Sequence, residues 1–442
     1  MTPCYAKLST RILPILFFGY LINYLDRVNI SFARLTMSSS LGIGDAAYGL
    51  GAGLFFLGYV IFQVPSNLIL ERVGARRWLA LIILIWGIIS ASTCLIRHEW
   101  QFFTIRLLLG AAESGFFPGA ILFLSEWYPS ALRGRILSGF LVAIPISGIL
   151  GGSLSGWILA TCHGGGLESW QWLFLLEGAP CLLAALWIFV ALPDSPSTVS
   201  WLTEEERGRL ADTLRRESEE RMQAGAPTCV GAALRLPEVW KLCLIYFCTA
   251  MGLYGFSFWL PVLLKDLGWQ NPLEIGLFSA IPWGVAAIGM IAWGYLADQQ
   301  RAWRIFAAWA ALIGGVGFIG CGLAPSAGVG LLTLSLAAAG VMGMMTTLWV
   351  IPGNLLNGTA AAAGIAVINA CGNLGGFVSP TLIGWTTQRT GSHAAGLYLT
   401  SAILFAASVA LFLLRSLDSP NKSGGANAVA SLQGAGRRER QS

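Results

Sequence analysis

Twelve apolar stretches of helical length most constrain the fold of this chain. They fall at residues 12–32, 47–70, 78–96, 101–124, 136–160, 171–192, 241–264, 274–297, 304–323, 329–352, 360–386 and 395–415. About 20 apolar residues cross the hydrocarbon core of a bilayer as a helix, whereas a tilted strand needs only about 10. Because lipid offers the backbone no hydrogen-bonding partners, stretches of this length predict transmembrane helices. The sequence therefore predicts an all-α membrane protein with twelve transmembrane helices.

The composition excludes a water-soluble fold. Only 11% of the 442 residues are charged and the mean hydropathy is +0.68, whereas soluble domains carry about 25% charged residues. The net charge of +5 does not indicate nucleic-acid binding, because the basic residues lie in short loops and not in a stripe. With the N-terminus placed in the cytoplasm, the outer loops hold only Arg34, Arg97, Lys265 and Arg389 of the 27 Lys and Arg residues. This asymmetry predicts that both termini are cytoplasmic.

A polar segment divides the apolar stretches into two groups of six. Within it, Thr203 and Glu206 have the spacing of a capping box that opens a charged helix. The tail is rich in Gly, Ser and Arg, a composition typical of disorder. We therefore expect an N-terminal six-helix bundle (1–192), a cytoplasmic linker with an amphipathic helix (193–240), a C-terminal six-helix bundle (241–415) and a disordered cytoplasmic tail (416–442).

The two halves repeat one loop motif. An acidic residue at a helix end is followed by basic residues, once after the second apolar stretch and once after the eighth. The residues of this loop motif are Glu71, Arg72 and Arg76 in the first half and Asp298 and Arg301 in the second. Parallel repeats of six helices are typical of secondary transporters, which bind substrate near the bilayer midplane between the repeats. We therefore assign the loop motif to gating.

The loop motif resembles the signature of the major facilitator superfamily, although Asn67 and Glu71 stand where that signature usually has Gly and Asp. Five further motifs resemble the anion:cation symporter family, which contains bacterial permeases for tartrate, sugar acids and aromatic acids. They are Asn23-Tyr24-Leu25-Asp26-Arg27-Val28-Asn29, Gly58-Tyr59 with Gln63 and Pro65, Arg106 with Gly110, Glu113 and Gly115, Trp172 with Glu177-Gly178, and Tyr254-Gly255 with Trp259 and Pro261. The resemblance implies the major facilitator fold, with twelve transmembrane helices in two pseudo-symmetric six-helix halves.

Four charged residues lie inside the predicted membrane helices: Asp26, Arg27, Arg106 and Glu113. A charge at a helix centre costs roughly 2.5–3.5 kcal/mol on insertion scales, so these residues indicate a functional site. Their charges sum to zero, and an incoming anion would add an uncompensated charge. If a carboxylate first binds a proton, an arginine is released and binds the anion. The four residues therefore predict proton-coupled binding of an anion.

The resemblance assigns a function to each of these residues. The family's first-helix arginine contacts the substrate carboxylate, the acids of helices one and four carry protons, and the fourth-helix arginine tunes the acid. Two asparagines in the eleventh stretch add amide groups from the second half. The expected substrate-binding residues are Arg27, Tyr24, Tyr59, Gln63, Asn369 and Asn373, and the expected proton-coupling residues are Asp26, Glu113 and Arg106. For each of them, a structural ion pair or ordinary helix packing is the alternative interpretation.

We therefore expect a secondary active transporter that imports a small organic carboxylate by proton symport with alternating access. The resemblance implies that the substrate is a tartrate-like hydroxy acid, a sugar acid or an aromatic acid. An organophosphate or other organic-anion antiporter of the same fold is the alternative, but the related antiporters use an arginine in the seventh helix, where this chain has only Lys241 and Lys265 at the ends.

The remaining expectations concern chemistry and surroundings. The sequence shows neither a nucleophile with its base nor metal-ligand spacing. We therefore expect that the protein is not an enzyme and that it binds no metal and no other cofactor. The expected coupling ion is H⁺. The expected partners are the small organic anion and the lipid bilayer, with no nucleic acid. We expect a monomer with many spans in a bacterial inner membrane.

Overall fold

The computed structural model describes residues 3–196, 199–223, 237–351 and 359–414, and its long elements are all helices. The helices of the first half are α1 (Pro3–Leu41), α2 (Asp45–Val73), α3 (Ala75–Ser92), α4 (Glu99–Glu113), α5 (Phe116–Trp127), α6 (Ser130–Leu141), α7 (Ala143–Thr161) and α8 (Ser169–Ala191). The remaining helices are α9 (Glu204–Gln223), α11 (Pro237–Asp266), α12 (Pro272–Gln300), α13 (Trp303–Gly322), α14 (Ala327–Leu348), α16 (Thr359–Thr390) and α17 (Ala394–Leu413). A 3₁₀ turn, η1 (Thr93–Leu95), follows α3. The tail at 416–442, which we expected to be disordered, lies outside the described residues.

Eleven helical segments in the described ranges are long and apolar enough to cross a bilayer. One of them, Glu99–Trp127, consists of α4 and α5, and another, Gly139–Thr161, joins the end of α6 to α7. The twelfth long helix, α16, is not among the eleven, but its 32 residues exceed the roughly 20 that a span requires. The predicted all-α membrane architecture is therefore confirmed.

The fourth predicted span is not one continuous helix. It turns at Ser114 and Gly115, between α4 and α5. A Cβ atom on Gly115 would lie 1.9 Å from Ser66 Oγ, so α2 approaches the chain closely at this turn. The span predicted over 101–124 is present as the segment Glu99–Trp127, but apolar patterning does not register the turn within it. Its consequence is that Glu113 is the last residue of α4.

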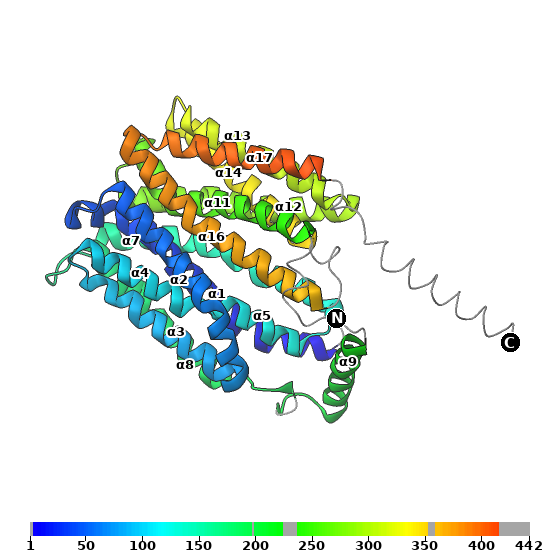
Figure 1. Ribbon diagram of the computed structural model, residues 1–442. Helices are drawn as coiled ribbons and strands as arrows, with labels where there is room; N and C mark the ends of the chain where they lie inside the picture. The colour runs from blue at the N-terminus through cyan, green and yellow to red at the C-terminus, as the bar shows by residue number, and fades with distance from the viewer. Residues whose placement is uncertain (1–2, 197–198, 224–236, 352–358, 415–442) are drawn as a thin grey trace, which may run out of the picture.

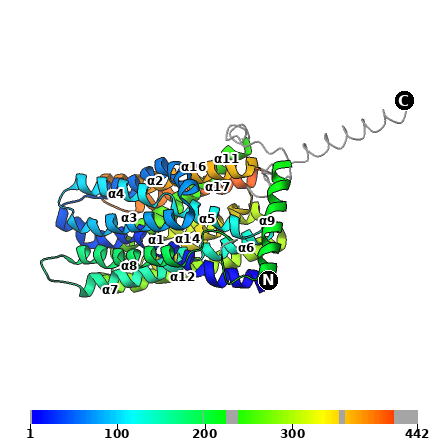
Figure 2. The same ribbon diagram turned by 90° about the horizontal axis from the view of Figure 1, so that it is seen from below.

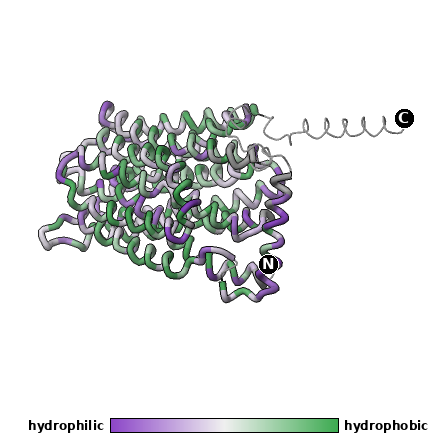
Figure 3. Tube along the Cα trace, turned by 60° about the horizontal axis from the view of Figure 1, so that its bottom comes forward, coloured by the Kyte–Doolittle hydropathy of each residue, from purple (hydrophilic) through white to green (hydrophobic). Residues whose placement is uncertain are grey.

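The outer surface of the bundle is apolar. Leu183, Val190 and Leu413 are 69–75% exposed, and such large exposed apolar side chains are stable against lipid tails but not against water. Hydrophobic residues run along the helices, whereas hydrophilic residues gather near the helix ends and along α9 (Figure 3). This distribution fits a bundle that stands in a bilayer.

Helices of the first half meet helices of the second half along two seams. α2 packs against α16, and α7 packs against α12, while α1 also contacts α11. Figure 1 shows α2 and α16 side by side, and the view from below in Figure 2 agrees. The two seams place the centre of α1 and α11 at the interface between the halves.

The two seams are tightest toward one end of the bundle, which we call the sealed end. A Cβ atom on Gly49 of α2 would lie 2.3 Å from the carbonyl oxygen of Pro380 on α16. On the other seam, a Cβ atom on Gly276 of α12 would lie 2.4 Å from the carbonyl oxygen of Gly152 on α7. Only glycine permits backbones to approach this closely. At the sealed end, therefore, little space separates the halves.

The linker helix α9 lies beside the start of the chain (Figure 1). Its N-terminus has the capping box that the sequence indicates, since Glu206 N donates to Thr203 Oγ1 over 3.2 Å and Thr203 N donates to Glu206 Oε2 over 3.0 Å. Lys7 Nζ donates to the same Glu206 carboxylate over 2.8 Å. The Lys7 ammonium beside it helps to hold the pKa of Glu206 below its usual value.

Candidate functional site

Arg27 and Glu113 form a buried ion pair between α1 and α4. Arg27 Nη2 lies 3.1 Å from Glu113 Oε2, and the two side chains are 6% and 0% exposed. Asn23, one turn before Arg27, donates to the same carboxylate oxygen over 2.9 Å and accepts from Arg27 Nη2 over 3.3 Å. A buried charge is stable only when it is paired and hydrogen-bonded. The three side chains therefore hold one another in place.

Asp26 faces a different set of partners from its neighbour Arg27. Its Oδ1 atom accepts hydrogen bonds from Ser90 Oγ on α3 and, over 3.1 Å, from Asn29 Nδ2 on α1. Its Oδ2 atom has no hydrogen-bond partner among the described residues. Adjacent residues point about 100° apart on a helix, so Asp26 and Arg27 engage different partners.

Arg106, on α4, forms no ion pair with a carboxylate in the described part of the chain. It is 2% exposed, and its Nε and Nη2 atoms have no hydrogen-bond partner there. Its guanidinium carbon lies 4.9 Å from the ring centre of Phe55 and 5.9 Å from that of Phe258. Cation–π contact therefore replaces ion pairing at this arginine. The four buried charges thus form one close pair, not two.

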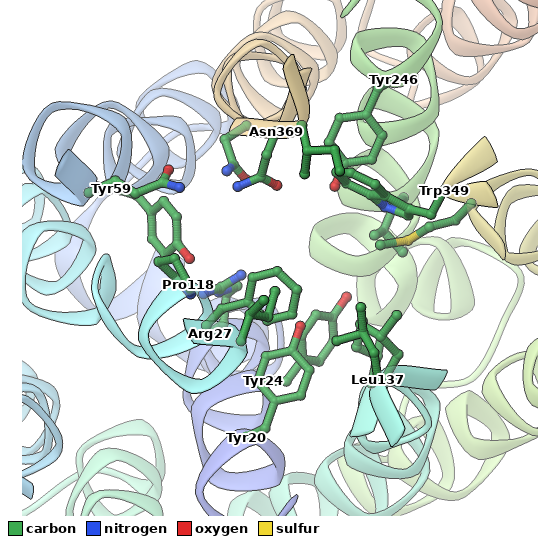
Figure 4. A pocket seen from close by; sticks show the side chains of 18 of the residues that line it. Tyr20, Tyr24, Arg27, Tyr59, Pro118, Leu137, Tyr246, Trp349 and Asn369 are labelled. Atoms are coloured by element: carbon green, nitrogen blue, oxygen red, sulfur yellow. The ribbon is translucent and has the colours of Figure 1, made fainter. Parts of the chain in front are cut away.

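A cavity of about 360 Å³ lies beside this ion pair, between the two halves. Side chains of the first and second halves surround it (Figure 4). Its walls contain Tyr20, Tyr24, Arg27, Tyr59, Gln63, Asn67, Phe117, Pro118, Ile121, Leu137, Leu141, Ile144, Tyr246, Leu253, Tyr254, Met345, Trp349, Ile365, Asn369 and Asn373. Among these described wall residues, Arg27 alone carries a charge. The remainder are apolar, aromatic or neutral amide side chains, as is usual for a small-molecule site.

The structure brings all six expected substrate-binding side chains to this one cavity. Arg27, Tyr24, Tyr59 and Asn369 surround its open centre in Figure 4, and Gln63 and Asn373 also line it. The expected proton-coupling residues Asp26, Glu113 and Arg106 are not among the described wall residues. They lie buried behind the wall, where Glu113 contacts Arg27.

Sequence reasoning missed several polar side chains of the site. Asn23 holds the Glu113 carboxylate, and Tyr20 and Tyr246 add phenol groups to the cavity wall. Asn23 and Tyr20 stand one and two helical turns before Arg27, so the 3.6-residue period was the signal that could have found them on this face of α1. For Tyr246 we find no comparable signal, because it comes from the other half of the chain.

None of the loop-motif residues is among the described wall residues of the cavity. Glu71 and Arg72 end α2, Arg76 begins α3, and Asp298 and Arg301 stand at the end of α12. Arg76 pairs with Asp194, with 2.8 Å between Arg76 Nη2 and Asp194 Oδ2. Arg301 caps α12 in the left-handed conformation, with φ of 52°. Glu71, Arg72 and Asp298 are exposed and form no ion pair in the described ranges. The structure therefore does not join the acid of either motif to its basic residues.

The predicted span boundaries put Arg34 in an outer loop. In the structure Arg34 lies within α1, because this helix continues to Leu41. Its guanidinium carbon lies 4.4 Å from the ring centre of Tyr48 and 4.2 Å from that of Trp259, and the group pairs with the Asp45 carboxylate. Trp259 belongs to the second half, whereas the other three side chains belong to the first. Arg34 therefore adds a contact between the halves near the sealed end.

Within the described residues, no group of three or more His, Cys, Asp or Glu side chains has the geometry of a metal site.

Comparison with known proteins identifies the fold family. The family model described as Major Facilitator Superfamily matches residues 16–380. The chain belongs to the Major Facilitator Superfamily. It is therefore a membrane transporter and not an enzyme. The expected twelve-helix fold in two halves is confirmed at this level.

Individual relatives support the assignment. The chain is 41% identical over 420 residues to a protein of Agrobacterium vitis named "Putative tartrate transporter", covering 94% of this chain and 91% of the relative. It is 34% identical over 410 residues to the inner membrane transport protein RhmT of Escherichia coli, covering 92% and 94%. The solved structure of the xylose transporter XylE from Escherichia coli matches with a TM-score of 0.74 at 16% identity, covering 92% of this chain and 97% of that one. XylE therefore shares the fold.

Proposed function

We propose that this transporter imports a small organic carboxylate together with protons, and that Arg27 binds the substrate carboxylate. The observation that carries the proposal is the position of Arg27, which lies in the cavity wall and is ion-paired to Glu113 behind that wall. A guanidinium group binds carboxylates through paired, charge-assisted hydrogen bonds. The cavity is thus suited to a small anion with apolar or hydroxyl-bearing parts.

Coupling follows from competition for the guanidinium group of Arg27. While Glu113 is ionised, it neutralises Arg27 and the cavity has little attraction for an anion. A proton on Glu113 removes that neutralisation, and Arg27 then binds the carboxylate of the substrate. The loaded site is neutral again, so the halves can move past each other without transferring a bare charge through a poorly solvated region. Proton and anion therefore travel together.

The other cavity residues select the substrate. Tyr24, Tyr59 and Gln63 from the first half and Asn369 and Asn373 from the second offer hydroxyl and amide groups around Arg27. Such groups fit the hydroxyls of tartrate-like or sugar acids, and the aromatic rings of the wall fit an aromatic acid. The similarity to a protein named for tartrate favours the hydroxy acids.

The buried groups behind the wall complete the coupling site. Asp26 binds a further proton, and the positive charge of Arg106 tunes both acids, which lie within electrostatic reach of it. Movement of the halves is controlled at the loop motif, whose residues are Glu71, Arg72, Arg76, Asp298 and Arg301.

The surroundings of the chain also belong to this proposal. Both termini are cytoplasmic in this proposal, which the asymmetry of Lys and Arg supports, and the sealed end then faces outward. The similarity to an inner membrane transport protein supports a bacterial inner membrane. We propose a monomer whose bundles at 1–192 and 241–415 rock against each other, joined by the linker at 193–240 and followed by the tail at 416–442.

Uptake into proteoliposomes tests the function. The purified chain is reconstituted, an inward proton gradient is imposed, and uptake of labelled L-tartrate, D-galacturonate and 4-hydroxybenzoate is measured against a collapsed gradient. We expect at least one carboxylate to accumulate only with the gradient. Accumulation of glycerol 3-phosphate in exchange for phosphate, without any response to the gradient, would instead establish the antiporter.

Glu113→Gln separates coupling from binding. The amide cannot ionise, so gradient-driven accumulation is expected to vanish while exchange of labelled for unlabelled substrate continues. Glu99→Gln, which removes an exposed carboxylate from the other end of the same helix, is the matched control and should behave as the wild type. Uphill uptake that survives in Glu113→Gln would contradict the proposed assignment.

A further inference from the structure

Asn67 lines the cavity but has no part in the proposed function. It lies near the end of α2, at the position where the superfamily signature usually has Gly. A chain with glycine there would lack this amide group in the cavity wall. The amide of Asn67 is therefore a candidate for substrate selection in this transporter.

Asn67 ends a row of three polar side chains on α2 that begins beside Arg27. The guanidinium carbon of Arg27 lies 5.2 Å from the ring centre of Tyr59. Gln63 and Asn67 follow Tyr59 at intervals of four residues, and residues four apart share one face of a helix. All three line the cavity, and from Tyr59 the helix rises about 6 Å to Gln63 and about 12 Å to Asn67. Asn67 therefore stands farther from the proposed anion-binding group than Gln63 does.

α16 runs antiparallel to α2 and lines the cavity beside it. A Cβ atom on Gly53 would lie 2.6 Å from the carbonyl oxygen of Phe377, and one on Gly376 would lie 2.6 Å from the ring of Phe56. Continued along both helices, this register sets Asn373 about level with Tyr59, Asn369 with Gln63, and Ile365 with Asn67, and all six side chains line the cavity. Figure 4 shows Tyr59 and Asn369 bordering the same open centre. Hydrogen-bonding groups therefore continue from Arg27 along both helices.

Two amide oxygens of this row have no partner. Gln63 Oε1 and Asn67 Oδ1 are both buried, and neither has a hydrogen-bond partner among the described residues. Buried acceptors are rarely left unsatisfied. Because both side chains border the cavity, a donor group bound there can satisfy them after a small rotation of each amide. The row is therefore suited to a ligand that donates hydrogen bonds.

The chemistry of the row favours a hydroxyl group as that donor. A hydroxyl donates to a carbonyl oxygen and accepts from an amide nitrogen, whereas an ionised carboxylate only accepts. An ammonium group would also donate, but it would lose its hydration in a cavity whose described wall residues include no acid. A hydroxyl therefore satisfies the amides without burying a second charge.

We propose that Asn67, together with Gln63, determines specificity by binding a hydroxyl group at the end of the substrate remote from its carboxylate. This inference rests on the proposed function, since it takes Arg27 as the ligand of the carboxylate. It narrows the substrate to a monocarboxylic acid that extends along α2 and carries a hydroxyl at its far end.

Calorimetric titration of the full-length chain in lipid nanodiscs tests the proposal. The ligands are ω-hydroxy acids of four, six and eight carbons, the unsubstituted acids and the dicarboxylic acids of the same lengths. In the wild type, at least one hydroxy acid should bind roughly 2–12-fold more tightly than its unsubstituted parent, the gain expected for one neutral hydrogen bond.

Asn67→Leu removes the amide with little change of volume. It should keep the affinity for the unsubstituted acids and lose the gain from the hydroxyl. Gln300→Leu is the matched control, because it removes an exposed amide at the end of α12, which is not among the described wall residues. This control should keep the wild-type gain. If Asn67→Leu folds poorly, Asn67→Gly introduces the usual signature residue, removes the same amide and should show the same loss.

The outcomes separate this inference from the proposed function. A hydroxyl gain that is absent from the wild type at every length, or that persists in both Asn67 variants, would overturn the role of Asn67, while binding of the acids would leave the proposed function intact. Dicarboxylic acids that bind more tightly than the hydroxy acids would overturn the assignment of a hydroxyl. If the wild type binds no acid of any series, the proposed function fails and this inference fails with it.

Discussion

Gly276→Ala is expected to separate the two halves at the sealed end. The added Cβ atom would lie 2.4 Å from the carbonyl oxygen of Gly152 and 2.9 Å from the Cα atom of Gly156, both on α7. The first distance is about 1.0 Å short of the 3.4 Å at which ordinary contact begins. The clashing atoms are backbone, so relief requires movement of α7 relative to α12.

The size of the effect follows from this overlap. Overpacking of a well-packed interface costs typically 1–3 kcal/mol. Here the penalty applies to the state in which the sealed end is closed and is absent once the halves part. A bias of 1–3 kcal/mol shifts an equilibrium between two conformations by roughly 5–150-fold. The population with an open sealed end should rise by that factor.

Hydrogen–deuterium exchange in lipid nanodiscs measures this shift without any label. Peptides from the end of α7 and the start of α12 should exchange faster in Gly276→Ala, and peptides from the cavity wall should exchange more slowly. Gly284→Ala is the matched control, because it lies on the same helix and its Cβ would meet nothing within 4 Å. If both variants exchange like the wild type, the tight glycine seam does not control closure and the reasoning fails.

Three further predictions address the cavity, the sealed end and the linker. Arg27→Gln should weaken binding of a transported carboxylate roughly 10–150-fold, the loss expected for a charge-assisted hydrogen bond of about 1.5–3 kcal/mol; unchanged affinity in calorimetry would exclude Arg27 as the anion ligand. Arg34→Gln removes two cation–π contacts, each worth about 0.5–2 kcal/mol, and should accelerate exchange at the sealed end, whereas protection equal to the wild type would show that Arg34 does not hold it closed. The folded-state pKa of Glu206 is lowered, mainly by the hydrogen bond from Lys7. The stability that ionised Glu206 contributes is therefore present above its usual pKa and is lost as the pH falls through the lowered value. The melting temperatures of wild type and Glu206→Gln should converge on acidification, and a constant difference would contradict this linkage.

The helices were predictable because lipid imposes one solution on the backbone. In lipid, the backbone of an apolar stretch of about 20 residues must satisfy its own hydrogen bonds. The positions of the spans therefore follow from where the apolar stretches lie in the sequence. The start of α9 was equally accessible, since the capping box at Thr203 and Glu206 is a local interaction. These features depend on residues that are close together in the sequence.

The structure departs from the predictions where contacts between residues far apart in the sequence determine the local conformation. The turn between α4 and α5 at Gly115 accompanies the close approach of Ser66 from another helix. Arg34 stays in α1 because Asp45 and two aromatic rings accept its charge. Hydropathy treats such a residue as the end of a span, since it carries no information about partners elsewhere in the chain.

The candidate site contains residues that the sequence could identify and contacts that it could not. The resemblance of the motifs selected Arg27, Tyr24, Tyr59 and Gln63, and the structure shows that all four line one cavity between the halves. That they bind the substrate stays a prediction. The charges alone did not reveal that Glu113 pairs with Arg27 and that Arg106 pairs with rings instead. That choice depends on the rotation and depth of α1 and α4, which sequence spacing does not determine.

The position of one guanidinium group explains why proton and anion would move together. At 3.1 Å and an effective dielectric constant of about 20, the attraction between Arg27 and an ionised Glu113 is on the order of 5 kcal/mol. A substrate carboxylate at a similar distance offers Arg27 a similar attraction, so neither partner displaces the other by charge alone. A proton on Glu113 removes one competitor and decides the choice for the substrate. The site is then neutral when it holds neither ligand and neutral when it holds both, whereas a proton or an anion alone leaves a net charge buried between the halves. Because that charge is costly in a low-dielectric interior, the two neutral states are the ones that can change conformation, which is the condition for symport.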